Sequence, residues 1–175
     1  MPDMTIPDWQ PTLRGTHVLL EPLQAGDFEA LYAVASDPLI WVQHPEPTRW
    51  QREVFAGFFQ GTMQSGGALC IRDAVTGDVI GSSRFYEWDA AAGDVAIGYT
   101  FLARSHWGGG VNGELKRLML DHALRYAQRV WFHVGTANHR SRRALAKIGA
   151  VFSHSCSADA TRGGRDVAYY VVHRA

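Results

Sequence analysis

Three consecutive glycines near the middle of the chain are the residues best suited to bind a ligand. Residues 105–112 read Ser-His-Trp-Gly-Gly-Gly-Val-Asn and lie between a strand-like run and a long amphipathic helix. Glycine lets a ligand approach the backbone closely, and the first N–H groups of a helix have no intrahelical partner. Because the helix dipole favours negative charge there, the segment predicts a site for phosphate or pyrophosphate. The other interpretation is a glycine loop that binds no ligand.

Two nucleotide-binding motifs can be compared with this segment. A P-loop needs Lys followed by Ser or Thr after its last glycine, whereas Val111 and Asn112 follow here, which argues against a nucleoside triphosphatase. Gly108, Gly110 and Gly113 have the G-x-G-x-x-G spacing of a dinucleotide fold. That fingerprint normally occupies the first βα turn and is followed by an acidic residue, and this chain meets neither condition. A nicotinamide-dinucleotide protein therefore stays an alternative that only the glycine spacing supports.

The residues on both sides of the glycines predict a βαβ unit. Residues 94–102 are rich in β-branched and aromatic side chains, as strands are, and Gly98 within them indicates a bulge or a close backbone approach. The helix after the glycines has one apolar face, and residues 130–134 read as the next strand. Such a unit is normally parallel and right-handed.

With this context, the chain resembles a known family. Gly108-x-Gly110 is similar to the acetyl-CoA pyrophosphate loop of the GNAT N-acetyltransferases, although Ser105 stands where that family has Gln or Arg. Residues 138–150 resemble the family's Asn-x-x-Ser-x-x-Ala/Val segment, which continues to Lys-x-Gly-Phe. Residues 13–23 look like the opening strand of the branch that contains ribosomal-protein N-terminal acetyltransferases. The resemblance covers nearly the whole chain.

The resemblance implies transfer of an acetyl group from acetyl-CoA to a primary amine, on a peptide N-terminus or a small molecule. It implies that Asn138 contacts the pantetheine arm and that Ser141 protonates the departing thiolate; without the family, both residues read as parts of a well-capped helix. Arg140, Arg142 and Arg143 form either a solvated helix face or a clamp for the CoA phosphates. The residues expected to bind acetyl-CoA are Thr100, Phe101, Leu102, Trp107, Gly108, Gly109, Gly110, Val111, Asn112, Asn138 and Arg143.

The general base is the least defined part of the predicted site. Similar proteins often carry a glutamate just before Ile-Gly-Tyr on the bulged strand, where this chain has Ala96. Glu87 is our candidate, and Asp94 and His133 are alternatives. A weak or remote base favours acceptors of low pKa, such as an α-amine near 8, over a lysine-like amine near 10.4. The missing glutamate also supports a second reading, a non-catalytic CoA-binding or sensor module.

Composition bounds the remaining possibilities. The 175 residues predict one domain over residues 1–175, and 17 basic against 17 acidic residues argue against a nucleic-acid binder with a basic surface. Cys70 and Cys156 are isolated and are expected to be buried free thiols, and no histidine spacing indicates a metal site. Without an apolar run of roughly 20 residues or a secretory signal, we expect a cytoplasmic protein that does not enter a membrane. A homodimer is compatible with this reading.

The elements around the motifs predict a mixed α/β sheet of six or seven strands with about four helices and a bulged central strand. Trp41 and Trp88 are next to loops and are candidates to line an acceptor cleft. A turn is expected at residues 162–165. The expected strands are 17–23, 68–72, 79–86, 94–102, 130–134, 151–155 and 167–172, and the first two helices are expected over 27–37 and 48–63.

Overall fold

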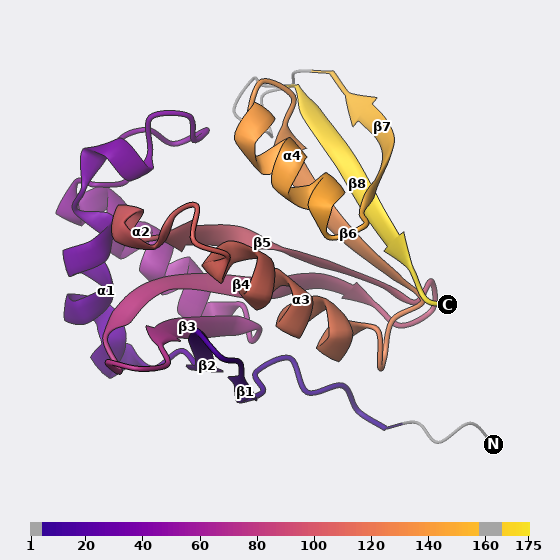
Figure 1. Cartoon of the computed structure of the whole chain (residues 1–175), viewed down its shortest axis with the longest axis horizontal. Coiled ribbons are helices and arrows are strands. Elements are labelled where there is room, and N and C mark those ends of the chain that lie inside the picture. The colour runs from indigo at the N-terminus through magenta and orange to yellow at the C-terminus, as the bar shows by residue number, and fades with distance from the viewer. Residues whose placement is uncertain (1–4, 158–165) are drawn as a thin grey trace.

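The computed structural model describes residues 5–157 and 166–175 and shows one mixed sheet beside four α-helices (Figure 1). The sheet order is β1-β2-β3-β4-β5-β6-β8-β7, and every neighbouring pair is antiparallel except β5 and β6. The strands are β1 Leu13–Arg14, β2 Val18–Pro22, β3 Ala68–Asp73, β4 Val79–Asp89, β5 Asp94–Leu102, β6 Arg129–Gly135, β7 Val151–Cys156 and β8 Val167–His173. The helices are α1 Phe28–Ala35, α2 Arg52–Gln64, α3 Val111–Ala123 and α4 His139–Lys147.

The predicted fold class is confirmed, with one correction to the strand count. The described residues form eight strands instead of six or seven, and the additional strand is β1, which pairs with Leu19 and Leu20 of β2. Two residues are too few to show the alternation that identifies a strand in a sequence. The turn expected at residues 162–165 lies outside the described residues. In the part of the chain that is described, each helix is too short or too polar to cross a bilayer.

The helices cover opposite faces of the sheet, as the alternation along β3 shows. Leu69 of β3 packs in one core with Leu115 of α3, while the adjacent Cys70 packs in a second core with Phe55 of α2. Because successive side chains of a strand point to opposite faces, α3 and α2 lie on different sides of the sheet.

Burial raises the pKa of the Cys70 thiol to about 12, so this cysteine is an inert core residue. Cys156 is also a free thiol, but it is only partly buried, which corrects the expectation of burial.

A bulge in β5 reverses its alternation. Ser82 and Arg84 of β4, two residues apart, face Phe101 and Gly98 of β5, which are three residues apart. The extra residue lies next to Tyr99, whose φ is 53°. A Cβ at Gly98 would lie 3.0 Å from the Tyr86 ring, which agrees with the close approach predicted there. The bulge places Phe101 in the core of α2 instead of the core of α3.

The parallel strands β5 and β6 separate soon after they meet. They pair only from Asp94–Ala96 to Arg129–Trp131, although β5 continues to Leu102 and β6 to Gly135. The Arg129 guanidinium closes the paired end with two hydrogen bonds to the Asp94 carboxylate, at 2.7 and 3.0 Å. Beyond that point the strands diverge, with α3 beside β5 and α4 beside β6 (Figure 1). The edge of β5 that faces β6 is therefore left without a neighbouring strand.

Candidate functional site

A cleft of about 1000 Å³ opens where β5 and β6 separate. The end of β5, most of the length of α3 and α4, the β1–β2 turn and part of the segment 40–44 form its walls. An unpaired strand edge presents backbone donors and acceptors to an extended ligand. The lining residues include His17, Trp41, His44, Thr100, Phe101, Leu102, Trp107, Gly108, Gly110, Asn112, Glu114, Lys116, Arg117, Asn138, Arg140, Ser141, Arg143 and Lys147.

The glycine loop forms one end of this cleft. Gly108 and Gly110 have φ values of 75° and 83°, in the left-handed region that disfavours residues with a Cβ. Gly110 is the N-cap residue of α3 and provides no side-chain cap. The N–H groups at the start of α3 thus point out of the helix without an intrahelical acceptor, as an anion site requires.

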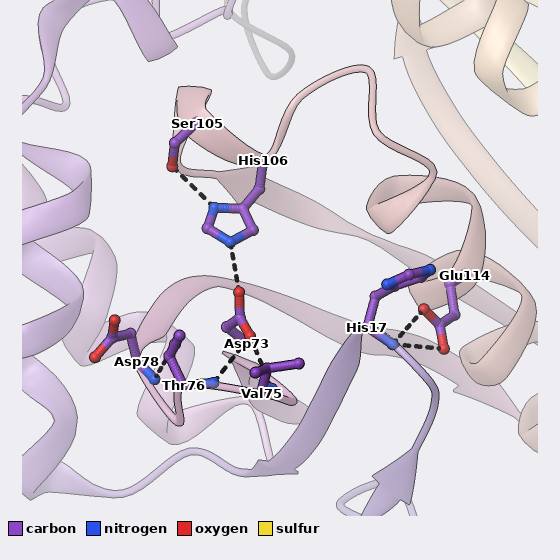
Figure 2. A network of polar contacts seen from close by, with 8 residues as sticks. All are labelled: His17, Asp73, Val75, Thr76, Asp78, Ser105, His106 and Glu114. Atoms are coloured by element: carbon purple, nitrogen blue, oxygen red, sulfur yellow. Dashed lines mark hydrogen bonds and ion pairs between the residues drawn. The ribbon is translucent and has the colours of Figure 1, made fainter.

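A hydrogen-bonded chain holds the residues just before the loop against the β3–β4 turn (Figure 2). Nε2 of His106 lies 2.9 Å from Oδ2 of Asp73, and Nδ1 of the same ring lies 2.9 Å from Oγ of Ser105. The other carboxylate oxygen of Asp73 accepts hydrogen bonds from the N–H groups of Val75 and Thr76. The His106 contact, followed by these two amides, lowers the pKa of Asp73 to about 2.

A second contact holds the residues just after the loop. The Glu114 carboxylate in the first turn of α3 accepts a hydrogen bond from the backbone N–H of Thr16 and one from that of His17, at 2.9 Å. Figure 2 shows the contact between His17 and Glu114. These contacts join the first turn of α3 to the β1–β2 turn, and Glu114 lines the cleft. The loop at residues 107–110 is therefore held between two anchored segments.

Basic side chains make the loop end of the cleft electropositive. The Arg140 guanidinium carbon lies 3.8 Å from the Trp107 ring centroid, and the Trp107 indole donates to the Leu102 carbonyl at 2.9 Å. Lys116 extends from α3 into the cleft, and its Nζ lies 5.9 Å from the Phe132 ring centroid. Burial lowers the pKa of Lys116 to about 8, so most molecules still carry its charge at pH 7. This arrangement can hold a polyphosphate, with the unpaired edge of β5 leading away from it.

Comparison with known proteins agrees with this geometry. A family model described as acetyltransferase (GNAT) domain matches residues 17–151, more than half of the chain. The chain belongs to the GNAT acetyltransferase family. No curated protein matches the sequence of this family member.

Solved structures of other GNAT proteins share the fold. A GCN5-related N-acetyltransferase from Brucella melitensis superposes with a TM-score of 0.84 at 22% identity, covering 94% of this chain and 79% of that one. Mycobacterium smegmatis RimJ in complex with CoA-disulfide gives a TM-score of 0.77 at 19% identity, with 95% and 89% covered. Spermidine N-acetyltransferase from Vibrio cholerae in complex with CoA and spermine gives 0.73 at 15% identity, with 91% and 97% covered.

The GNAT cleft gathers most of the residues predicted from the sequence, and three lie elsewhere. Gly109 and Val111 do not line the cleft; Gly109 is exposed and Val111 is buried under the first turn of α3. Glu87 is exposed and has a φ of 55°. It lies near the end of β4, beside the part of β5 that is still paired with β6. The predicted residues in the cleft are Thr100, Phe101, Leu102, Trp107, Gly108, Gly110, Asn112, Asn138, Ser141 and Arg143.

Among the arginines of α4 and the two candidate tryptophans, some residues line the cleft and others do not. Arg140 and Arg143 line the cleft, while Arg142 turns away and donates to the Tyr170 hydroxyl at 3.0 Å and the Thr136 carbonyl at 2.9 Å. Trp41 lines the cleft, as the sequence suggested. Trp88 instead packs against Trp9, with ring centroids 5.2 Å apart, in the core that contains α3.

Tyr86 and His133 meet where β5 and β6 begin to separate. The Tyr86 hydroxyl lies 3.2 Å from Nδ1 of His133, and Gly98 of β5 leaves space for the Tyr86 ring. The sequence offered His133 only as one of several candidate bases and gave no reason to select Tyr86. The alternation of side chains along β4 could not reveal that Tyr86 contacts His133, because the two residues are 47 positions apart in the sequence.

Negative charge in the loop should interfere with anion binding. We expect Gly110→Asp to weaken CoA binding by about tenfold or more, through like-charge repulsion at the start of α3. Gly110→Asn is the matched control, because it has nearly the same shape and tolerates positive φ without the charge. Isothermal titration calorimetry with CoA measures the effect, and equal affinity for the folded Asp and Asn variants would contradict the assignment.

The Asp73–His106 contact should contribute pH-dependent stability. Because the folded pKa of Asp73, about 2, lies below the unfolded value, its contribution is present above about pH 4 and is lost as the pH falls through 2. We expect Asp73→Asn to lower the free energy of unfolding at pH 7 and this difference to shrink between pH 4 and pH 2. Urea denaturation at several pH values tests this, and a difference that stays constant with pH would disprove it.

Proposed function

We propose that this GNAT protein transfers the acetyl group of acetyl-CoA to a primary amine, on a peptide N-terminus or a small molecule. One observation supports the proposal: a single cleft is lined both by the glycine loop and by the end of β5, whose edge has no neighbouring strand. Acetyl-CoA has the matching parts, since a pyrophosphate is followed by an extended arm of amide groups and then by the thioester.

The donor would bind along the cleft from its phosphate end. Its pyrophosphate would accept hydrogen bonds from the amides around Gly108 and Gly110, and Arg140 and Arg143 would neutralise further phosphate charge. The pantetheine amides would pair with the free edge of β5 beyond Ala96, as an added strand does. Asn138 already accepts a hydrogen bond from the Ser141 N–H through Oδ1, at 3.3 Å, so its side-chain NH₂ group can face the arm.

The reaction needs three contributions from the protein. The amine nitrogen attacks the thioester carbonyl, and N–H groups of β5 near the bulge are placed to stabilise the oxyanion that forms. The thiolate leaves and takes a proton, for which the Ser141 hydroxyl is our candidate donor, and the proton that the nitrogen loses as the amide forms restores that hydroxyl. The attacking ammonium must first lose a proton, and the Tyr86–His133 pair lies closer to the opening between the strands than Glu87 does. We therefore favour His133 over Glu87 as the group that receives this proton.

The acceptor is proposed to be an α-amine. The Ala96 position lacks a carboxylate, and Ala96 is itself buried. An ammonium with a pKa near 8 is partly neutral at pH 7 to 8, whereas one near 10.4 is almost fully charged. An enzyme without a carboxylate at this position should therefore acetylate α-amines faster than lysine-like amines.

A turnover assay tests the proposal. We expect release of free CoA thiol from acetyl-CoA when a panel of α-amines is supplied, and a larger thermal shift with CoA than with NAD. CoA binding without thiol release across the panel would favour the alternative of a non-catalytic CoA-binding module. A thermal shift with NAD alone would disprove both readings.

Ser141 provides a test of the chemical step. If its hydroxyl protonates the thiolate, Ser141→Ala should lower kcat by about 10²–10⁴-fold and leave the Kd for CoA nearly unchanged. Ser141→Thr, which retains a hydroxyl, should keep more of the activity than the Ala variant. A wild-type kcat in the Ala variant would show that Ser141 has only a structural role in the first turn of α4.

A further inference from the structure

Two arginines flank an aromatic pair beside the bulge of β5. The guanidinium carbon of Arg84, on β4, lies 3.5 Å from the Tyr99 ring centroid. The guanidinium carbon of Arg49, just before α2, lies 4.1 Å from the Phe58 ring centroid. The Phe58 and Tyr99 centroids are 6.3 Å apart, so the two cations lie around one small apolar surface.

Neither guanidinium forms an ion pair with a carboxylate among the described residues. The Nε atoms of Arg49 and Arg84 are both buried without a hydrogen-bond partner in the described part of the chain. Glu46 acts on the charge of Arg49 from a distance, and its carboxylate accepts hydrogen bonds from the N–H and hydroxyl of Thr48. Two half-buried guanidinium groups therefore share one distant carboxylate among the described residues, and an external anion would balance the remaining positive charge.

The charges around Arg49 also favour the binding of an anion. Burial lowers the pKa of Arg49, and the positive charge of Arg84 acts in the same direction, while Glu46 and Tyr99 oppose them. Two like charges held close together repel each other unless an anion is placed between or beside them. Guanidinium groups are the side chains best shaped for two-point binding of a carboxylate.

The arginine pair borders the acceptor end of the cleft. A hydrogen bond of 3.4 Å joins Arg49 to His44, and both His44 and the adjacent Trp41 line the cleft. Arg84 and Tyr86 are two residues apart on β4 and lie on the same face, roughly 7 Å apart along the strand. The Arg84 guanidinium lies over the Tyr99 ring, and the Tyr86 ring lies 5.0 Å from the same Tyr99 ring, so an anion bound at Arg84 would be on the side of the sheet that carries the Tyr86–His133 pair.

We propose that Arg84 and Arg49 bind a carboxylate of the acceptor, which is therefore an anionic α-amine. The inference rests on the proposed function, because it assigns the acceptor of the same cleft. A C-terminal carboxylate of a dipeptide and an acidic side chain at the second position of a peptide N-terminus share this chemistry. A polyamine such as spermidine would be disfavoured by the same two charges.

Binding of matched acceptors tests the assignment without relying on turnover. Isothermal titration calorimetry compares alanyl-phenylalanine with alanyl-phenylalaninamide, and the α-amide of alanyl-glutamate with that of alanyl-glutamine. In one of the two pairs, we expect the peptide with the carboxylate to bind at least about ten times more tightly than its amide. The pair that shows this preference identifies whether the arginines bind the C-terminal or the side-chain carboxylate. Equal affinities within both pairs would overturn the proposal.

Variants of Arg84 and Arg49 test whether these residues recognise the carboxylate. Arg84→Met and, independently, Arg49→Met should remove the preference for the carboxylate member, and the second variant keeps the test valid if the first does not fold. Arg52→Met is the matched control, because Arg52 also lies over aromatic rings, those of Phe28 and Tyr32, but pairs with Glu29 on the exposed side of α2. Preferences that persist in both folded Met variants would disprove the role of the arginines.

Turnover separates this inference from the proposed function. If the carboxylate is preferred in binding but no amine of the panel is acetylated, the proposed acetyl transfer fails while the arginine site stands. If neutral amines are acetylated as efficiently as anionic ones and bind as tightly, the arginine site fails while acetyl transfer stands.

Discussion

The early end of the β5–β6 ladder is the constraint on which the rest of the site depends. Three residue pairs, closed by the two hydrogen bonds from Arg129 to Asp94, hold the strands together at one end only. Past Ala96 the two strands separate, and the sheet gains an internal edge whose backbone groups need partners. Every proposed contact of the donor arm, and the opening through which an acceptor would reach the thioester, exists because that ladder does not continue.

The glycine loop shows how a flexible sequence can be given a defined position. Glycines alone would leave a loop with high conformational entropy. Here His106 is held to Asp73 on one side, and Glu114 is held to the amides of Thr16 and His17 on the other. The short free segment between them keeps the backbone exposure that an anion needs, while its ends cannot move far.

Much of the fold and of the lining of the candidate cleft could be predicted from the sequence, because their signals are local. The glycine spacing, the cap at Asn138 and the period of β5 all lie within short windows, and the βαβ unit was confirmed as parallel. The acceptor side could not be predicted in this way. Tyr86 meets His133, and Arg49 meets the surface around Tyr99, through contacts between distant segments that no local pattern encodes. Glu87 illustrates the limit, since its type suggested a base while the structure leaves it exposed beside the paired part of β5 and β6. Tyr86 and His133 also lie outside the cleft lining, but at the point where the two strands begin to separate.

The bulge in β5 has a consequence for how this strand can change during evolution. Ile97 packs in the core of α3 and Phe101 in the core of α2, although four residues separate them, an even number that would otherwise keep them on one face. Deleting one residue at position 99 or 100 would leave Ile97 and Phe101 three positions apart, an odd number that regular alternation places on opposite faces. Phe101 and Leu102 would therefore keep their present faces without the bulge, whereas a deletion in the regular part of the strand would move side chains from one core to the other. The turn between β4 and β5 could change length while each face of the sheet kept its residues.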